Sequence, residues 1–509
     1  MNALPQTSSA HWKTATLLGA VLFLSFIYFY EGGGWNQNSR FDLLRAIVEQ
    51  HTLTIDDYHE NTQDVARSGG HYYSDKAPGL VFLALPFARA ARASMQAVGI
   101  DPESVRGEFA LSYLVIAFTV ALPAALAGVC IFLLGIQFGS STTAAAFSAL
   151  VLCVGSPFLA YASLFWAHAL VGACLVFGFA AATMLTSPER NSKEAGGLRE
   201  GVGPTYAESG WPEFVCGLAV GLSAGWATVT EYPAAPASAM LALLALALAW
   251  PRGVAARWRV AAGVGLGAGL CVVVLLSYLH AGFGGFRPSY AYYDPNSFSF
   301  MQRQGYLGLT YPHPDRLLKL LFGCARGLFF ASPVLVAAPA GLWWLWKDER
   351  FSRPALAAAG IVAYYFLFNA SFYWWKAGLT FGPRYAGAAI PFLCLGLAVC
   401  WDRANRAWRR VLVALVACSV FVALMVVSTT SQLAMQESCP IMRSSWPAFW
   451  AGRMAMNQDS MLTLAEAGGR YGAFNLGQLM GLHGIASLIP LLAVWTAAGL
   501  VWVRIRHGE

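Results

Sequence analysis

The first chemically versatile residues of the chain are acids and one lysine. Asp42 lies on a segment with helical spacing, and Asp56 and Asp57 follow in a polar stretch. Asp75 stands beside Lys76, just before a Pro-Gly helix start. Ionised carboxylates can act as general bases, and a lysine at this place can meet a lipid phosphate at headgroup depth. These residues are therefore the first candidates for a site.

Asp42 belongs to WNQNSRFDLLRAIVEQ, whose spacing predicts a short amphipathic helix over residues 35–50. Its apolar arc contains Phe41, Leu44, Ile47 and Val48, and its charged arc contains Asp42, Arg45 and Glu49. One interpretation is an interfacial helix whose charges face water. The other is that Asp42 points across the membrane surface into a site, with Arg40 and Arg45 near enough to set its geometry.

The composition predicts a polytopic membrane protein. Of 509 residues, 57% are hydrophobic and 12% are charged, and a soluble fold could not bury so many long apolar runs. The first run, Trp12 to Tyr30, is too long and too aromatic for a cleaved signal and predicts a signal anchor. The net charge of +7 is spread as arginines and lysines in short loops. This positive-inside pattern argues against nucleic-acid binding.

Apolar runs of about 18–25 residues predict about twelve membrane spans. They cover 12–30, 109–136, 143–163, 168–186, 213–230, 233–250, 260–279, 327–346, 355–373, 385–400, 411–429 and 480–503. With the amino terminus inside, the arginine-rich loops all fall on the cytoplasmic side. This parity requires the apolar segment Pro78–Ala97 to be a helix that lies in the outer leaflet without crossing. Counting it as a span would invert every later loop.

This topology predicts a single integral-membrane domain, 1–509, whose varied polar residues lie on the outer side. Its parts are a first outer loop with amphipathic helices (31–108), core spans (109–250), a second outer loop (280–326), and C-terminal spans (327–509) with a short outer loop (374–384) and a late one (430–479). Cys324 and Cys439 are the two cysteines expected outside the membrane, and a disulfide between them is left open.

Several stretches, taken in order, resemble the GT-C glycosyltransferases. A first span precedes an outer amphipathic helix and the motif Lys-Ala-Pro-Gly (76–79), which opens an apolar helix. GSPFLAYASLFWAHAL (155–170) resembles a short outer hairpin of this superfamily, and FGPRYAGAAIPFL (381–393) resembles its late Pro-Arg-Tyr segment. The closest resemblance is to the subgroup of the lipid A aminoarabinose transferases, the protein O-mannosyltransferases and the Rgt-type sugar transferases.

The resemblance implies an all-α, GT-C-like bundle among the lipids of the bacterial inner membrane, with its active site on the periplasmic or extracellular side. It implies inverting transfer of a hexosyl or pentosyl group from a polyprenyl-phosphate donor to a glycan, lipid or protein acceptor, with an aspartate base. The candidates for binding the donor phosphate are Lys76, Arg384 and Arg326. The cavity and acceptor candidates are Asp75, Arg40, Arg45, His168, Glu231 and Tyr232.

The chain departs from this family at the catalytic acid. Relatives carry an Asp or Asp-Glu at the start of the first outer helix, where this chain has Asn36, Gln37 and Asn38. Amides cannot act as general bases. The candidates for the displaced base are, in order, Asp42, one of Asp57 and Asp56, and Glu31.

No cofactor is required by this pattern. His168 stands where the family has a second acid, which argues against a carboxylate-bound metal there. A divalent cation elsewhere in the site stays open.

Two other functions fit the sequence less well. A lipid-linked glycan flippase or another transporter would carry charges inside its spans and show two related halves. Here no internal repeat is found, and Glu231 at the edge of a span is the main such charge. An O-antigen polymerase or ligase would concentrate its function in a large late loop, whereas this chain has its longest outer loop first.

Overall fold

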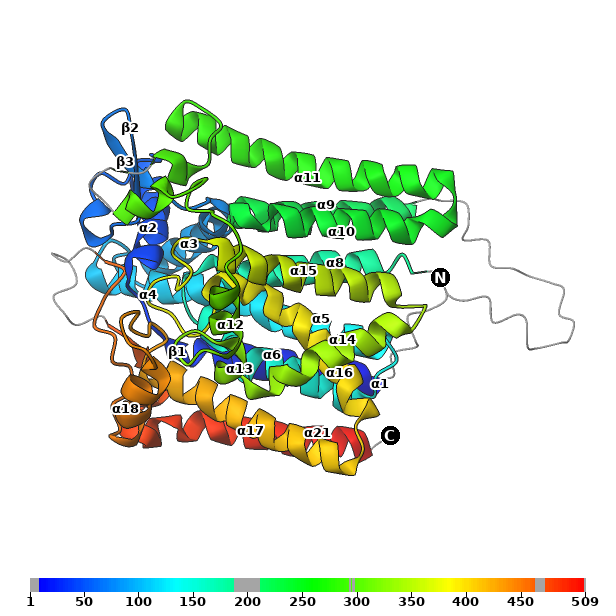
Figure 1. Ribbon diagram of the computed structural model, residues 1–509. Coiled ribbons are helices and arrows are strands. Elements are labelled where there is room, and N and C mark those ends of the chain that lie inside the picture. Colours follow the sequence, from blue (N-terminus) through cyan, green and yellow to red (C-terminus); the bar gives the residue numbers. More distant parts are fainter. Residues whose placement is uncertain (1–8, 187–210, 293, 295–297, 463–471, 508–509) are drawn as a thin grey trace, which may run out of the picture.

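The computed structural model describes residues 9–186, 211–292, 294, 298–462 and 472–507. Long helices lie side by side in this part of the chain, and most of the short helices and strands gather at the left-hand end in Figure 1. α1 (Ser9–Ile27) begins and α21 (Ile489–His507) ends at the opposite end of the bundle. An even number of crossings produces this arrangement.

The other helices follow in chain order. In the first half they are α2 (Trp35–Arg45), α3 (Gly79–Ala97), α4 (Val105–Ile116), α5 (Leu122–Gln137), α6 (Thr142–Val154), α7 (Phe158–Ala162), α8 (Ala167–Thr183), α9 (Trp211–Thr230) and α10 (Ala235–Ala249). In the second half they are α11 (Val254–Phe283), α12 (Pro314–Phe322), α13 (Leu328–Ala331), α14 (Ala338–Lys347), α15 (Ser352–Ser371), α16 (Ile390–Arg403), α17 (Arg406–Thr429), α18 (Trp446–Trp450) and α20 (Leu476–Leu479).

The spanning helices confirm an all-α polytopic membrane architecture. In the described ranges, 9 helical segments are long and apolar enough to cross a membrane, and each coincides with a predicted span. Three predicted spans are built from shorter pieces instead. The stretch 143–163 holds α6 and α7, 168–186 holds α8, and 327–346 is divided between α13 and α14 by a turn that begins at Pro333. The number twelve therefore stays a prediction.

The predicted outer loops converge at the left-hand end of the bundle in Figure 1, which we call the outer end. β1 (Phe29–Tyr30) pairs antiparallel with β4 (Phe474–Asn475), so the exit of α1 is tied to the late loop. Residues 293 and 295–297 of the second outer loop and 463–471 of the late loop lie outside the described residues.

α3 is the apolar helix that the charge pattern places in the outer leaflet. It continues through Pro86, packs against α2 and α4 at the outer end, and is not one of the spanning segments found in the described chain. Leu80, Ala84 and Ala88 recur every fourth residue and are buried. This is the spacing of a helix that lays one face on its neighbours.

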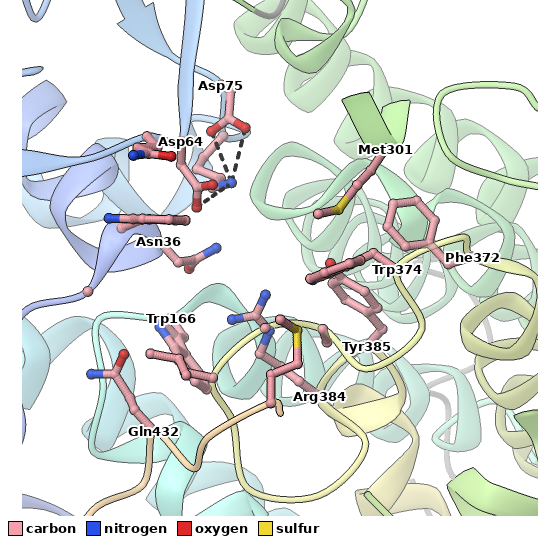
Figure 2. A pocket seen from close by; sticks show the side chains of 18 of the residues that line it. Asn36, Asp64, Asp75, Trp166, Met301, Phe372, Trp374, Arg384, Tyr385 and Gln432 are labelled. Atoms are coloured by element: carbon pink, nitrogen blue, oxygen red, sulfur yellow. Dashed lines mark hydrogen bonds and ion pairs between the residues drawn. The ribbon is translucent and has the colours of Figure 1, made fainter. Parts of the chain in front are cut away.

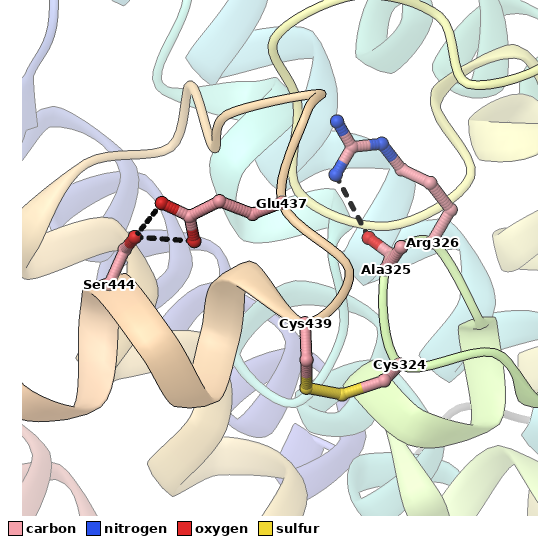
Figure 3. Close-up of a disulfide and its surroundings, with 6 residues drawn as sticks. All are labelled: Cys324, Ala325, Arg326, Glu437, Cys439 and Ser444. Carbon is pink, nitrogen blue, oxygen red and sulfur yellow. Dashed lines mark hydrogen bonds between the residues drawn. A yellow bond between two sulfur atoms is a disulfide. The ribbon is translucent and has the colours of Figure 1, made fainter.

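A disulfide joins the second outer loop to the late loop. It links Cys324 to Cys439, whose Cα atoms are 4.9 Å apart (Figure 3). Beside it, the buried guanidinium of Arg326 donates hydrogen bonds to backbone carbonyls of three outer loops. The acceptors are Ala325, Lys376, Gly378 and Leu433, at 2.9–3.3 Å. The loops that surround the site are therefore held together covalently and by hydrogen bonds.

Candidate functional site

A β-hairpin in the first outer loop carries the main candidate residues. β2 (Val65–Ser68) pairs antiparallel with β3 (His71–Ser74). Gly69 and Gly70 form the two-residue connection, and both have a positive φ, 61° and 91°. Two-residue turns with positive φ match the twist of paired strands, and glycine adopts them without strain. The Gly-Gly pair thus fixes the register of the hairpin.

The open end of this hairpin brings two carboxylates to one ammonium group. Because Val65 pairs with Ser74, the residues just outside that pair, Asp64 and Asp75, are neighbours. Lys76 Nζ lies 2.9 Å from Asp64 Oδ2 and 3.0 Å from Asp75 Oδ1 (Figure 2). Burial alone would lower the pKa of Lys76, but the two carboxylate charges outweigh it and raise this pKa above its usual value. Burial raises the pKa of Asp75 to about 6, although the Lys76 charge opposes the rise.

Neighbouring elements fix the segment that carries Lys76. Ser289 Oγ donates a hydrogen bond to the backbone carbonyl of Asp75 at 2.6 Å, and the Tyr232 hydroxyl lies 3.0 Å from the same Oγ. Gly79 starts α3 against the end of α9, where a Cβ atom would lie 2.6 Å from the backbone nitrogen of Thr230. A larger residue there would push the lysine segment away from α9.

The open end of the hairpin faces a cavity of about 470 Å³, which we call the main cavity (Figure 2). Its polar lining includes Asn36, Gln63, Asp64, Asp75, Lys76, Gln302, Arg384, Gln432 and Asp459. Its apolar lining includes Trp166, Met301, Phe372, Trp374 and Tyr385. These residues come from every predicted outer loop and from the hairpin between α7 and α8. The main cavity is therefore the place where the outer loops meet.

Arg384 lies across the main cavity from the hairpin (Figure 2). Its guanidinium carbon is 4.8 Å from the ring centre of Trp166 and 5.4 Å from that of Tyr385. Arg384 is 9% exposed, and within the described residues it makes no ion pair and its Nε has no hydrogen-bond partner. A buried cation without a counter-ion is costly unless an anion joins it. Arg384 and Lys76 together suit a bound phosphate.

The N-terminal end of α2 also borders the main cavity, through Gly34 and the two residues after it. Of the three amides that stand where relatives carry an acid, Asn36 is the one on the cavity lining. Its Oδ1 accepts a hydrogen bond from Arg40 Nη1 at 2.5 Å, and Arg40 Nη2 lies 2.6 Å from Glu231 Oε1. The partial positive charge of a helix N-terminus adds to the attraction for an anion.

The three aspartates predicted as bases lie outside the lining of the main cavity. Asp42 is completely buried on α2. Asp56 lies 2.7 Å from His71 Nδ1 near the tip of the hairpin, and Asp57 accepts a hydrogen bond from Gln50 at 2.7 Å. The prediction that one of them is the base therefore gains no support from the shape of the cavity.

Three further predicted residues stabilise the outer end away from the main cavity. Glu31 accepts a hydrogen bond from the Thr430 hydroxyl at 2.7 Å and ties the end of α1 to the late loop. Arg45 forms a buried ion pair with Glu108 at 3.5 Å. The guanidinium of Arg326 donates to the backbone carbonyls described above and is not on the lining of the main cavity, so its role in binding the donor stays a prediction.

His168 begins α8 beside a second cavity of about 20 Å³, whose lining also includes Glu231 and Tyr385. In the described chain, no group of three or more His, Cys, Asp or Glu side chains is arranged to hold a metal ion. Two of the carboxylates on the lining of the main cavity, Asp64 and Asp75, are instead paired with Lys76.

The sequence interpretation missed Asp64 and Trp166. The signal for Asp64 was present, because VARS and HYYS flank Gly-Gly and predict a hairpin whose ends meet. Trp166 had no comparable signal, since its place on the lining depends on how the hairpin between α7 and α8 meets loops distant in the sequence.

Neither a family model nor a curated protein sequence matches this chain. Solved structures do match it. ArnT from Cupriavidus metallidurans bound to undecaprenyl phosphate aligns at 15% identity and a TM-score of 0.53, over 98% of this chain and 77% of that one. ArnT from the same organism in the apo state aligns at 15% identity with a TM-score of 0.48, over 82% of this chain and 65% of that one. The apo oligosaccharyltransferase of Archaeoglobus fulgidus aligns at 14% identity with a TM-score of 0.42, over 83% of this chain and 55% of that one.

At this level of identity the ArnT alignment establishes the fold. The chain spans between 65% and 77% of the length of the ArnT chains it matches. The resemblance that the order of the sequence motifs predicts is thereby confirmed at the level of the fold: this chain has the fold of that ArnT structure.

Proposed function

We propose that this protein is an inverting membrane glycosyltransferase that moves a sugar from a polyprenyl-phosphate donor to an acceptor at the outer face of the membrane. The observation that carries the proposal is the main cavity, in which Lys76 and Arg384 provide two cations and three aspartates provide carboxylates. The aspartates are Asp64, Asp75 and Asp459, and the first two lie beside Lys76. Cations stabilise a phosphate as it leaves, and a carboxylate accepts the proton of the attacking hydroxyl. The ArnT structure of the same fold was solved with undecaprenyl phosphate bound.

In the proposed reaction the acceptor oxygen attacks the anomeric carbon from the face opposite the phosphate. The bond from that carbon to the phosphate oxygen breaks, and the electron pair stays on the polyprenyl phosphate, where Lys76 and Arg384 stabilise it. The acceptor proton goes to a carboxylate of the main cavity. A single displacement of this kind inverts the anomeric configuration.

Asp64 is the base that the main cavity favours. Its side chain is 19% exposed, compared with 9% for Asp75, so it is the more accessible of the two carboxylates beside Lys76. We assign Asp75 the task of orienting Lys76. The fully buried Asp42 remains the alternative base proposed from the sequence, and the two assignments are separable by mutation.

Aromatic side chains on the cavity wall suit the sugar. Trp166, Phe372 and Trp374 line the main cavity, and flat rings pack against the apolar faces of pyranose and furanose sugars. Several side-chain amides on the same lining, including Gln302 and Gln432, can donate hydrogen bonds to sugar hydroxyl groups and accept hydrogen bonds from them. The donor is thus proposed to be a hexosyl or pentosyl lipid, and the acceptor a glycan, lipid or protein.

The disulfide supports an extracytoplasmic site. Disulfides persist in the periplasm and outside the cell and are rare in the cytosol, and Cys324–Cys439 lies at the outer end with the main cavity. The arginine-rich loops predicted as cytoplasmic belong to the opposite end. We therefore place the reaction on the periplasmic or extracellular side of a bacterial inner membrane.

The proposal is tested by mass spectrometry of lipid-linked sugars and surface glycans in a deletion strain and its parent. The deletion strain is expected to accumulate one polyprenyl-phosphate sugar and to lack the same sugar on a surface glycan, lipid or protein. Wild-type protein is expected to restore both, and the Lys76→Ala variant neither. Lys319→Ala is the matched control, because Lys319 is 56% exposed and pairs with Asp315 on α12.

Two results would contradict the proposal. One is an unchanged set of lipid-linked sugars in the deletion strain. The other is accumulation of the lipid-linked sugar on the cytoplasmic leaflet together with no transfer by the purified protein, which would identify a flippase.

A further inference from the structure

The second cavity borders the main cavity and is lined by three polar side chains among apolar and aromatic ones. Its volume of about 20 Å³ admits one group of the size of a water molecule. His168 from the start of α8, Glu231 from the end of α9 and Tyr365 from α15 line it. Tyr385 lines both cavities, so the two share a wall.

Two buried polar atoms of this lining are incomplete. His168 Nε2 and the hydroxyl of Tyr365 have no hydrogen-bond partner among the described residues. The residues are 8% and 4% exposed, so bulk water does not complete them. Most buried polar atoms in proteins are hydrogen-bonded, and exceptions indicate a bound group.

A chain of polar contacts connects the second cavity to the main one. Glu231 uses Oε1 for its ion pair with Arg40, which in turn donates to Asn36 on the lining of the main cavity. Glu231 Oε2 makes no hydrogen bond with a described residue and is free to accept one. Because Arg40 already balances its charge, the second cavity gains nothing from a cation, and a second carboxylate would be repelled.

We propose that the second cavity is a sugar-reading subsite, in which His168, Tyr365 and Glu231 bind a single hydroxyl group of the donor sugar. The inference rests on the proposed function and assigns it a substrate class: neutral sugars that carry a hydroxyl at the position facing Tyr385. One hydroxyl can donate to the Glu231 carboxylate and, with its two lone pairs, accept from the Tyr365 hydroxyl and from His168 Nε2–H. Uronic acids with a carboxylate at that position are excluded by charge and by volume.

The test uses a panel of synthetic polyprenyl-phosphate hexoses and pentoses, followed by the monodeoxy analogues of the best substrate. Wild-type protein is expected to prefer the parent sugar over one monodeoxy analogue by about tenfold to a hundredfold in kcat/KM. Tyr365→Phe removes one hydroxyl group from the protein. It is expected to lower the ratio of kcat/KM for the parent sugar to kcat/KM for that one analogue about tenfold, and to leave the ratios for the other analogues unchanged. Coupling between one substrate group and one side chain is the signature of direct contact.

Tyr364→Phe is the matched control. The Tyr364 hydroxyl is adjacent on α15 but already donates to the carbonyl oxygen of Pro233 at 2.6 Å. Its loss is expected to leave every parent-to-deoxy ratio unchanged. An equal loss for all sugars in Tyr365→Phe would mean that the cavity holds a structural water, and would overturn the inference.

If the proposed function itself is wrong, the wild-type protein transfers no sugar of the panel. Equilibrium competition by the same analogues against polyprenyl phosphate then decides the second cavity. A loss of affinity confined to one deoxy analogue, and reduced by Tyr365→Phe, supports the subsite. Equal affinities for parent and deoxy sugars overturn it.

Discussion

The two ends of α2 use polar residues for opposite purposes. At the N-terminal end, uncharged residues around Asn36 border the main cavity, opposite Lys76 and Arg384. At the C-terminal end, Arg45 and Glu49 join Arg92 and Glu108 in a buried group that we call the charge cluster. α2 is buried on all sides from Gln37 to Arg45, so the predicted interfacial helix with charges facing water is wrong. The end of α2 with more charge is the end farther from the cavity lining.

The charge cluster is a network of ion pairs, and Arg92 also links it to an exposed acid, Glu103, at 3.0 Å. Arg92 Nη1 lies 2.9 Å from Glu108 Oε1 and 3.3 Å from Glu49 Oε1, and Arg45 Nε lies 3.3 Å from the same Glu49 atom. All four side chains are 12% exposed or less. Two acids and two bases balance each other, which fits a structural role in joining α2, α3 and α4. At the cavity end, by contrast, Arg384 has no counter-ion among the described residues.

The largest expected effect separates the two candidate bases. Asp64→Asn is expected to lower kcat about 10²–10⁴-fold, because it removes a general base and keeps the shape of the side chain. Asp42→Asn is expected to change kcat less than about tenfold, since Asp42 lies outside the cavity lining. Single-turnover transfer with purified variants measures both. A full loss in Asp42→Asn with an active Asp64→Asn would return the base to α2.

Breaking the charge cluster is expected to affect stability and not catalysis. Arg45→Ala leaves Glu108 without one of its two arginine partners and is expected to lower the free energy of unfolding by about 3–5 kcal/mol. The folded fraction is expected to retain its kcat. Thermal unfolding in detergent, combined with transfer per folded molecule, checks the prediction. A large fall in kcat without a fall in stability would place the cluster in the site.

Removal of the disulfide is expected to loosen the loops around the cavity. Cys324→Ser opens a link between residues 115 positions apart and is expected to cost about 2–4 kcal/mol of stability. Cys418→Ser is the control, because Cys418 is an exposed, unpaired cysteine on α17. Equal melting temperatures for the two variants under oxidising conditions would show that the link does not stabilise the outer end.

The smallest expected effect concerns pH. Asp75 has a pKa raised to about 6, so it is ionised above this pH and takes up a proton as the pH falls through it. A neutral Asp75 no longer orients Lys76, and the KM for the donor is expected to rise below about pH 6. In Asp75→Asn this inflection is expected to disappear. An inflection that persists in that variant would assign it to another group.

The membrane architecture was predictable because it depends on local composition. Long apolar runs such as Val105–Gln137 mark spans wherever the rest of the chain lies. Lys76 and Arg384 were also predictable, since each stands within two residues of a proline at the outer boundary of an apolar helix. Both residues line the main cavity, at the end of the bundle where the predicted outer loops gather.

The base and the second cavity were not predictable in the same way. Asp42 ranked first among the candidate bases because the helical spacing around it is visible in the sequence. Asp64 reaches Lys76 through the pairing of β2 with β3, which the alternation of apolar and polar residues indicates only weakly. His168, Glu231 and Tyr365 lie far apart in the sequence and meet only through the packing of α8, α9 and α15. Such long-range packing leaves no periodic trace in the sequence.

The most direct test of the account is the affinity of the purified protein for undecaprenyl phosphate in wild-type, Lys76→Ala and Arg45→Lys forms. If Lys76 binds the donor phosphate in the main cavity, Lys76→Ala is expected to weaken binding by about tenfold to a hundredfold, since hydrogen bonds to charged groups contribute about 1.5–3 kcal/mol. Arg45→Lys, which keeps the charge of the cluster, is expected to bind as wild type does. Equal affinities for wild type and Lys76→Ala would contradict the account.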